Sequence, residues 1–410
     1  MNTGYSRLSS SHARVALLIL ALATLFCLEV SLSPLWQGNA DRPKRGAGDA
    51  ALYRAIVERI HNGQGYYQAT AAEQTAEGYP TRSVFNWRTP LPMHVIALLP
   101  QIQWAKYVLG LLSLALMFMA FESLARDKTG DCPNFRVNEN GTVPFRPSRT
   151  RSSAAALACA LLLSGPLLFN VIDNLFVMPI LWAAVFIALS LCAYGINKPW
   201  LGMATALLAL FMSELALPYC LLCAAMTWFK PKPEKNGADT NENPRCAQRP
   251  LDIRRPNNRR LSIEILAWGL GLSAWLIFFA WHCWNVSGLI APGAIAHRHG
   301  WIRFGGAGFV LATAQMNAYL LLLPPWATAI YFAAAMFGLA GWHSPLGTRM
   351  GLTACLYVMV FAVVGQDLNQ YWGSLTAPIL CFGIVRFPAS MRDLCRAALS
   401  SGRRRKLSAA

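Results

Sequence analysis

Between the first two long apolar runs of the chain, residues 48–67 read GDAALYRAIVERIHNGQGYY and residues 85–100 read FNWRTPLPMHVIALLP. Within the first stretch, an apolar residue recurs at every fourth position (Leu52, Ile56 and Ile60), between an acid, Asp49, and Gly63. That spacing predicts an amphipathic helix over residues 49–62. The segment 90–100 is apolar but too short to cross a bilayer. Both segments are therefore expected to lie along the membrane surface, within one long polar connection.

The composition indicates that the rest of the chain is a membrane protein. Of the 410 residues, 55% are hydrophobic and only 13% are charged, which is more apolar surface than a soluble core can bury. Runs long enough to cross the hydrocarbon layer predict a single integral membrane domain, all-α and polytopic, with about 8 to 10 transmembrane helices. The expected runs cover residues 15–36, 104–122, 153–171, 175–195, 262–284, 321–342, 351–365 and 371–388.

A further apolar segment, 199–229, is interrupted near its middle by Ser213-Glu214. It is too short for two full crossings of about 20 residues each. We expect two shorter helices that meet inside the protein, because a broken helix at membrane depth has to be buried or line a wet cavity. Glu214 then either points into such a cavity or is neutralised by a partner.

The net charge of +17 is distributed unevenly among the loops. Most lysines and arginines fall in segments 126–151 and 230–260 and in the tail 389–410. By the positive-inside rule these segments and both termini are cytoplasmic. The basic excess is therefore a topology signal, and nucleic acid is not an expected partner. The outer face then receives the loops 37–103 and 286–320.

The cysteines and the short motifs exclude several classes of protein. The eleven cysteines fall mainly in apolar runs or in expected cytoplasmic loops, so they are interpreted as small hydrophobes and not as metal ligands. The chain has no Walker motif, no GxSxG and no dinucleotide fingerprint. An ATPase, a serine hydrolase and a Rossmann enzyme therefore have no support.

Asp49 is the acid most suited to chemistry in the long outer loop. As the residue that opens the 49–62 helix, it is a favoured N-cap, where its carboxylate accepts a backbone N–H. At the membrane surface the same carboxylate would accept a proton from a hydroxyl or help to hold a divalent ion. The two roles are compatible.

Two arginines of the same loop lie near Trp87: Arg88 follows it directly, and Arg82 precedes it by five residues. A guanidinium binds phosphate through two parallel hydrogen bonds, and an indole stacks on a sugar or an isoprenoid chain. These residues therefore suit a lipid phosphate. The alternative is that Trp and Arg only anchor the loop at the interface.

Two more polar groups of residues are expected on the outer face. The first is interpreted as an anion-attracting rim, because paired histidines without a carboxylate or cysteine are a weak metal motif. The second lies in the short link before the last apolar run and either binds substrate or solvates the turn. The first group is His297, Arg298, His299 and Arg303, and the second is Gln366, Asp367 and Tyr371.

The order of these features resembles the GT-C glycosyltransferases, membrane enzymes that use polyprenyl-phosphate sugar donors. A long outer loop begins with an acid on an interfacial helix, a basic residue precedes proline, and two half-length helices meet at a polar residue. The chain is similar to a bacterial subgroup of uncharacterised GT-C-like proteins. The stretches that carry the resemblance are 48–67, 85–100, 213–219 (SELALPY) and 370–386 (QYWGSLTAPILCFGIVR).

The resemblance implies a GT-C-like bundle in the bacterial inner membrane, with the site facing the periplasm. The activity implied is hexosyl or pentosyl transfer from a polyprenyl-phosphate donor to a hydroxyl of a glycan, lipid or protein. Asp49 matches the family's acid, and Arg88 matches the basic residue before proline. Tyr53, from the same interfacial helix as Asp49, is expected on the substrate side with Glu214.

The family's paired acidic motif is incomplete here, because Ala50 follows Asp49. A divalent cation, Mg²⁺ or Mn²⁺, would need a second acid from elsewhere in the fold. The candidates are Glu214, Asp173 and Asp367.

Other functions remain compatible with the sequence. A sugar-lipid flippase or transporter also has intramembrane acids and broken helices. A silent relative would bind lipid-linked sugar without turning it over, and a hydrolase would cleave polyprenyl phosphate. The polar residues gather on one face of the membrane and no inverted repeat is evident, which favours the enzyme.

Overall fold

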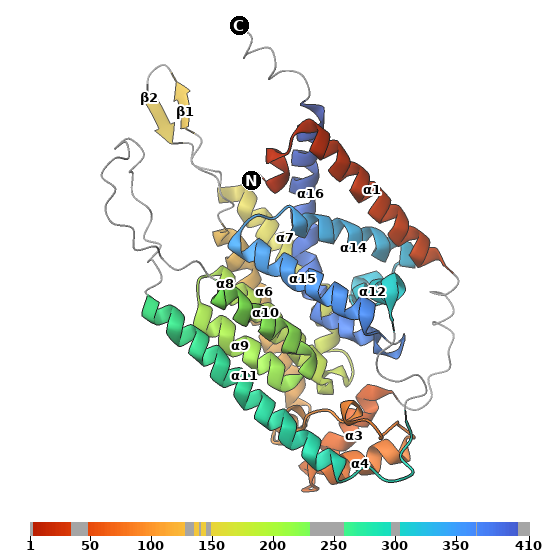
Figure 1. Cartoon of the computed structure of the whole chain (residues 1–410). Coiled ribbons are helices and arrows are strands. Elements are labelled where there is room, and N and C mark those ends of the chain that lie inside the picture. The colour runs from red at the N-terminus through yellow and green to blue at the C-terminus, as the bar shows by residue number, and fades with distance from the viewer. Residues whose placement is uncertain are drawn as a thin grey trace.

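The computed structural model describes residues 3–33, 48–127, 135–138, 141–144, 149–229, 258–296, 304–365 and 367–400. Within these ranges the protein is helical apart from one hairpin, in which β1 (Phe135–Asn138) pairs antiparallel with β2 (Gly141–Pro144). The helices form a bundle with shorter helices gathered at one end (Figure 1). The expected all-α class is confirmed.

Five helices of the described ranges are long and apolar enough to span a membrane. A sixth span results if η6 (Asp367–Leu375) and α16 (Ala377–Leu399), which meet at a bend of 55°, are counted together. These helices are consistent with a membrane protein, with fewer long spans than the sequence predicts. The five are α1 (Ser10–Leu32), α6 (Trp104–Arg126), α7 (Arg149–Leu167), α11 (Asn258–Ser287) and α15 (Pro345–Val363).

Four further apolar helices are too short to cross a bilayer alone. Each of them begins with a proline in its first turn. Proline has no N–H to give to a preceding turn and favours the first helical position, so it starts a new helix inside an apolar run. The four are α8 (Pro179–Gly195), α9 (Pro199–Met212), α10 (Leu217–Trp228) and α14 (Pro325–Ala340).

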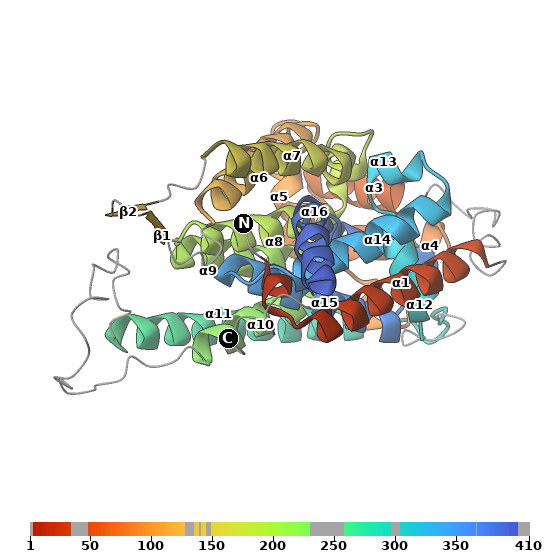
Figure 2. The same ribbon diagram turned by 90° about the horizontal axis from the view of Figure 1, so that it is seen from above.

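Helix α8 is the centre of the bundle. Its side chains are buried on every side from Pro179 to Val185 and again from Ile187 to Ala193. A helix that is apolar all round has to be enclosed by other helices. Seen from above, α6 and α7 cover one side of α8 and α11 lies on the other (Figure 2).

The segment 199–229 forms two short helices, as expected. Helix α9 ends at Met212, a 3₁₀ turn η5 (Glu214–Ala216) follows, and α10 begins at Leu217. The Tyr219 hydroxyl donates to Ser190 Oγ of α8 at 2.8 Å, which holds the start of α10 against the centre of the bundle. Glu214 therefore lies at the break between two helices.

The cap layer is the set of short helices at one end of the bundle, α3 (Asp49–His61), α4 (Tyr66–Ala76), η2 (Val84–Asn86) and α5 (Pro90–Ala97) (Figure 1). Helix α3 buries Leu52, Tyr53, Ile56 and Val57 on one face, which confirms the amphipathic helix expected there. A 3₁₀ turn of the bundle, η4 (Leu175–Val177), packs against α3, and a second turn, η3 (Leu168–Asn170), packs against η4.

The N-cap of α3 is Gly48 and not Asp49, so the expected capping role of Asp49 is wrong. Gly48 has a φ of 84°, a conformation that glycine adopts without strain, and its carbonyl accepts the first helical N–H groups. Asp49 is the first residue of the helix and its side chain makes no capping bond. Its carboxylate is therefore free of the helix backbone.

The opposite end of the bundle is held together by the first described residues. The Thr3 N–H donates to Asp393 Oδ2 at 2.8 Å, and η1 (Gly4–Arg7) packs against α16. The Trp342 indole donates to Asp127 Oδ2 at 2.6 Å, and the Arg386 guanidinium lies over the Trp342 ring at 4.7 Å. These contacts join the residues before α1, the end of α6 and the connection between α14 and α15 to one another through α16.

The remaining helices, α12 (Gly306–Ala314) and α13 (Ala318–Leu321), precede α14, which packs closely on α16. The close approach depends on glycine. A Cβ at Gly338 would lie 2.0 Å from the Gly383 carbonyl oxygen, and a Cβ at Gly383 would lie 2.3 Å from the Ala335 carbonyl oxygen. Small residues allow helix backbones to approach in this way.

Replacing Gly383 by alanine is expected to push α14 away from α16 and to lower the free energy of unfolding by about 1–3 kcal/mol, the range for overpacked sites. Gly269→Ala on α11 is the matched control, since a Cβ there has no neighbour within 4 Å. The control should be neutral or slightly stabilising because alanine favours the helix. Unfolding in detergent would measure both variants, and equal midpoints would contradict the prediction.

Candidate functional site

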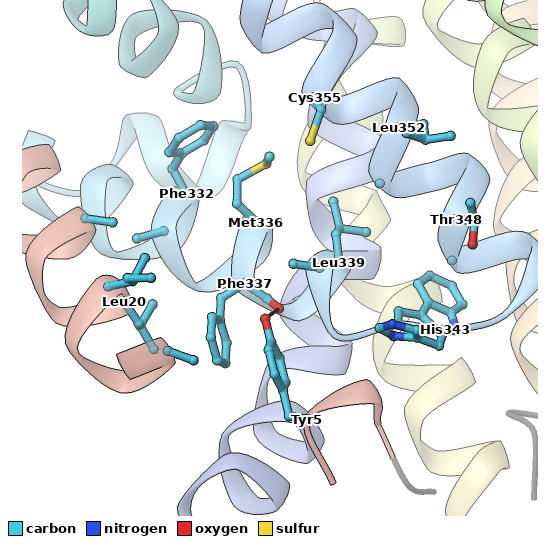
Figure 3. A pocket seen from close by; sticks show the side chains of 18 of the residues that line it. Tyr5, Leu20, Phe332, Met336, Phe337, Leu339, His343, Thr348, Leu352 and Cys355 are labelled. Carbon is cyan, nitrogen blue, oxygen red and sulfur yellow. Dashed lines mark hydrogen bonds between the residues drawn. The ribbon is translucent and has the colours of Figure 1, made fainter. Parts of the chain in front are cut away.

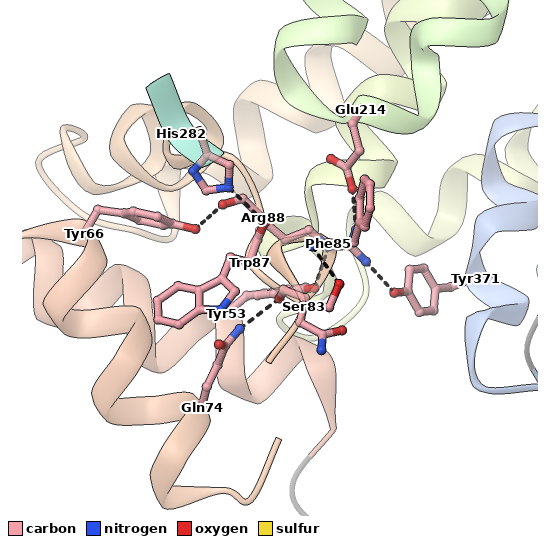
Figure 4. Close-up of polar contacts among 11 residues, drawn as sticks. Tyr53, Tyr66, Gln74, Ser83, Phe85, Trp87, Arg88, Glu214, His282 and Tyr371 are labelled. Atoms are coloured by element: carbon pink, nitrogen blue, oxygen red, sulfur yellow. Dashed lines mark hydrogen bonds and ion pairs between the residues drawn. The ribbon is translucent and has the colours of Figure 1, made fainter. Parts of the chain in front are cut away.

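The Arg88 guanidinium is the centre of the polar contacts between the cap layer and the bundle. Its Nε donates to the Tyr53 hydroxyl at 3.1 Å, Nη1 to Glu214 Oε1 at 2.5 Å and Nη2 to the Tyr371 hydroxyl at 3.0 Å. Figure 4 shows Glu214 and Tyr371 reaching Arg88 from different elements. Together, Tyr53, Arg88, Glu214 and Tyr371 form what we call the Arg88 cluster.

The Arg88 cluster brings together four segments that are far apart in the sequence. Tyr53 belongs to α3, Arg88 follows η2, Glu214 opens η5 and Tyr371 lies in η6. The side chains of Arg88 and Glu214 are 13% and 19% exposed. At that burial the pair is removed from most of the solvent.

The partners of Arg88 stabilise its positive charge. Burial acts to lower the pKa of Arg88, but Tyr53, Tyr371 and Glu214 raise it well above its ordinary value. Burial raises the pKa of the Tyr53 phenol, Arg88 opposes that shift, and Asp49 adds to it. Arg88 is therefore a permanent cation, and Tyr53 stays a neutral hydroxyl that both Arg88 and Asp49 influence.

Asp49 lies beside the cluster and has its own partner. Its Oδ1 accepts a hydrogen bond from the Tyr79 hydroxyl at 2.9 Å. Burial and the Asp49 charge both raise the pKa of Tyr79, so that phenol remains a donor. Tyr79 was not expected from the sequence, because a lone tyrosine in a loop carries no local pattern.

The segment that carries Arg88 is folded tightly on itself. The Trp87 indole donates to the Thr81 carbonyl at 3.0 Å, and the Asn86 side-chain amide donates to the Pro80 carbonyl at 2.5 Å. The Trp87 side chain is only 3% exposed. Its ring is therefore packed inside the cap layer, and the expectation that it stacks on a sugar does not fit this arrangement.

A small cavity adjoins the guanidinium. It is lined by Tyr53, Arg88, Ser213, Tyr371 and the start of α8. Its size suits about one water molecule. A larger group would reach Arg88 only by displacing one of the present partners.

The other expected site residues do not join the cluster. The Arg82 side chain is exposed, and only its backbone N–H is engaged here, donating to the Ile295 carbonyl at 3.2 Å. Asp173 sits in a tight turn with a φ of 43°, and its neighbour Asn174 accepts a hydrogen bond from Arg54. His297, Arg298, His299, Arg303 and Gln366 lie outside the described residues, as does the side chain of Asp367.

The donors required by a divalent cation do not come together in the described part of the chain. No group of three or more His, Cys, Asp or Glu side chains is found there. Asp49 is bonded to Tyr79 and Glu214 to Arg88. These residues do not form a ligand set for Mg²⁺ or Mn²⁺.

A large apolar groove lies elsewhere, between α1, α14 and α15 (Figure 3). It has a volume of about 640 Å³ and is lined mainly by carbon, with Leu20, Phe332, Met336 and Leu352 among its walls. It shares no residue with the Arg88 cluster. The groove is therefore not the site of polar chemistry.

Comparison with known proteins gives no match to this chain among protein-family models, curated proteins or solved structures.

The Arg88–Glu214 pair should be energetically coupled. We expect a double-mutant cycle with Arg88→Met and Glu214→Gln to give about 2 kcal/mol or more, between the values of exposed and fully buried pairs. The exposed Glu122–Arg126 pair on α6 is the control and should give about 0.3–0.5 kcal/mol. Unfolding in mixed micelles would measure both, and equal coupling in the two pairs would refute the expectation.

Proposed function

We propose that this protein is a membrane glycosyltransferase of the GT-C type that uses a polyprenyl-phosphate sugar. The observation that supports it best is the Arg88 cluster, a shielded guanidinium with a carboxylate, Asp49, beside it. A cation next to a base is the pair required for transferring a sugar from a phosphate to a hydroxyl. The resemblance of the sequence to the GT-C enzymes agrees with this assignment.

The reaction would break the bond between the sugar's anomeric carbon and the phosphate oxygen. Negative charge then develops on the phosphate, which would displace one of the three present partners of Arg88 and accept hydrogen bonds from the guanidinium in its place. Because Arg88 stays protonated, the stabilisation is present over the whole physiological pH range.

Asp49 would accept the proton of the acceptor hydroxyl while that oxygen bonds to the anomeric carbon. The Tyr79 hydrogen bond to Oδ1 holds the carboxylate in one orientation and leaves its other oxygen for the acceptor. A single displacement of this kind inverts the configuration of the sugar. The acceptor itself is a hydroxyl compound of the cell envelope.

The cap layer is assigned to the periplasmic face of the bacterial inner membrane, with both termini in the cytoplasm. The support is the distribution of basic residues along the sequence. The lipid tail of the donor would lie among the apolar helices, and its phosphate would lie at the cap layer.

A sugar-lipid transporter is the second candidate. One observation favours it: Glu214 lies at the break between two short helices and is paired with a cation, an arrangement that transporters use in their translocation path.

In a transfer assay with purified protein in lipid and a panel of labelled polyprenyl-phosphate sugars, Asp49→Asn should lower the rate about a hundredfold or more, the effect of losing a general base. Arg88→Lys should also lose most activity, because lysine lacks the planar fork. Glu58→Gln, an exposed acid on the same helix as Asp49, is the control and should retain activity. Donor binding without turnover, unchanged in Asp49→Asn, would reject the transferase and support the transporter or a silent binding protein.

The orientation is open to a separate test. A reporter inserted at Gly63, an exposed turn after α3, should be found in the periplasm. Insertion near residue 400 should give a cytoplasmic signal. A cytoplasmic reporter at Gly63 would invert the topology and remove the proposed site from the periplasm.

A further inference from the structure

The backbone around Arg88 is held in place by side chains of α4 and α11. Three consecutive carbonyl oxygens each accept a hydrogen bond from a side chain of another helix. Gln74 Nε2 donates to the Asn86 carbonyl at 2.9 Å, His282 Nε2 to the Trp87 carbonyl at 3.1 Å, and the Tyr66 hydroxyl to the Arg88 carbonyl. Figure 4 shows these donors converging on the segment.

The tautomer of His282 follows from its two partners. A carbonyl oxygen only accepts, so Nε2 has to carry the proton toward Trp87. Nδ1 is then the acceptor for the Tyr67 hydroxyl, 3.2 Å away. Both nitrogens of a fully buried ring are thereby satisfied by a neutral imidazole.

His282 is the contribution of α11 to this arrangement. The buried residues of α11 include Trp268, Trp275 and His282, each seven positions after the last. That spacing keeps one stripe of the helix against the bundle, and His282 ends the series next to the cap layer. Most other side chains of α11 face outward.

A second contact joins the same regions. The segment after α11 accepts the Arg82 N–H at the Ile295 carbonyl, 3.2 Å away. The loop that carries Arg88 is therefore attached at Arg82 to the residues that follow α11 and at Trp87 to α11 itself. Helix α11 is about 45 Å long and reaches the cap layer only at its C-terminal end (Figure 1).

We propose that His282 is a positioning residue for the site: by donating to the Trp87 carbonyl, it sets the orientation in which Arg88 presents its guanidinium. The effect of His282 on catalysis rests on the proposed function, but its effect on the orientation of Arg88 is independent of that function. An arginine whose backbone is already held in place loses little conformational entropy when it binds a ligand. Its guanidinium is therefore preorganised.

The test separates the two nitrogens of the ring. His282→Gln can place an amide N–H near the position of Nε2 and is expected to keep the bond to Trp87. His282→Asn is shorter and reaches only the region of Nδ1, so it should lose that bond. Asn285→Ala, one turn further along α11, is the control, because the Asn285 side chain donates only to the Trp281 carbonyl of its own helix.

The readout is the rate at which phenylglyoxal, an arginine reagent, modifies Arg88 in lipid nanodiscs, measured by mass spectrometry. Arg88 is shielded and engaged in wild type, so it should react slowly. His282→Asn should raise the rate about tenfold, the factor expected for one buried hydrogen bond, while His282→Gln and Asn285→Ala should stay within about twofold of wild type. The exposed Arg59 should react equally in all variants.

The labelling needs no substrate, so its outcome is independent of the proposed function. Equal Arg88 rates in wild type and His282→Asn would overturn the positioning role, whatever the transfer assay gives. If the rates differ but wild type turns over no donor, the positioning role stands and the transferase fails. If the wild type is active, His282→Asn should lower kcat by about tenfold with KM nearly unchanged, as expected for a group that acts on the transition state.

Discussion

The contact between Arg88 and Glu214 is the constraint on which the arrangement of the other elements depends. A guanidinium and a carboxylate shielded to this degree are costly to desolvate unless each is paired and its remaining donors are satisfied. Tyr53 and Tyr371 supply those further contacts. The cap layer is therefore held to the bundle by a polar contact that has to form in one geometry.

That requirement explains where the helices break. Glu214 reaches Arg88 because α9 ends at Met212 and a short 3₁₀ turn follows. Tyr371 reaches it because η6 precedes α16 at a bend of 55° instead of continuing it. A continuous helix at either place would direct these side chains along a regular face. The irregular backbone of the bundle thus lies where the polar cluster needs it, as expected of non-helical segments at membrane depth.

Local patterns in the sequence predicted much of the fold and part of the cluster. The helix after Gly48, the short helix at Pro90 and the break at Glu214 follow from apolar spacing, proline and one interrupting acid. Arg88, Glu214 and Tyr371 were expected as site residues, although their mutual contacts were not. Pairing between distant segments leaves no local pattern, so Tyr79 and His282 were missed. For His282 a signal does exist, the seven-residue spacing from Trp268 and Trp275 that places it on the buried stripe of α11.

The hydrogen bonds that hold Arg88 in place help to decide between an enzyme and a transporter. A translocation path has to open alternately to both sides, which requires its binding groups to move with one half of the protein against the other. Here the backbone of residues 86–88 is bonded to α4 through Gln74 and Tyr66 and to α11 through His282, while the Arg88 guanidinium is bonded to α3, η5 and η6. Movement of any of these elements would break contacts with a partly buried cation. Such a group is better suited to stabilising charge at a fixed point, which is what transfer from a phosphate requires.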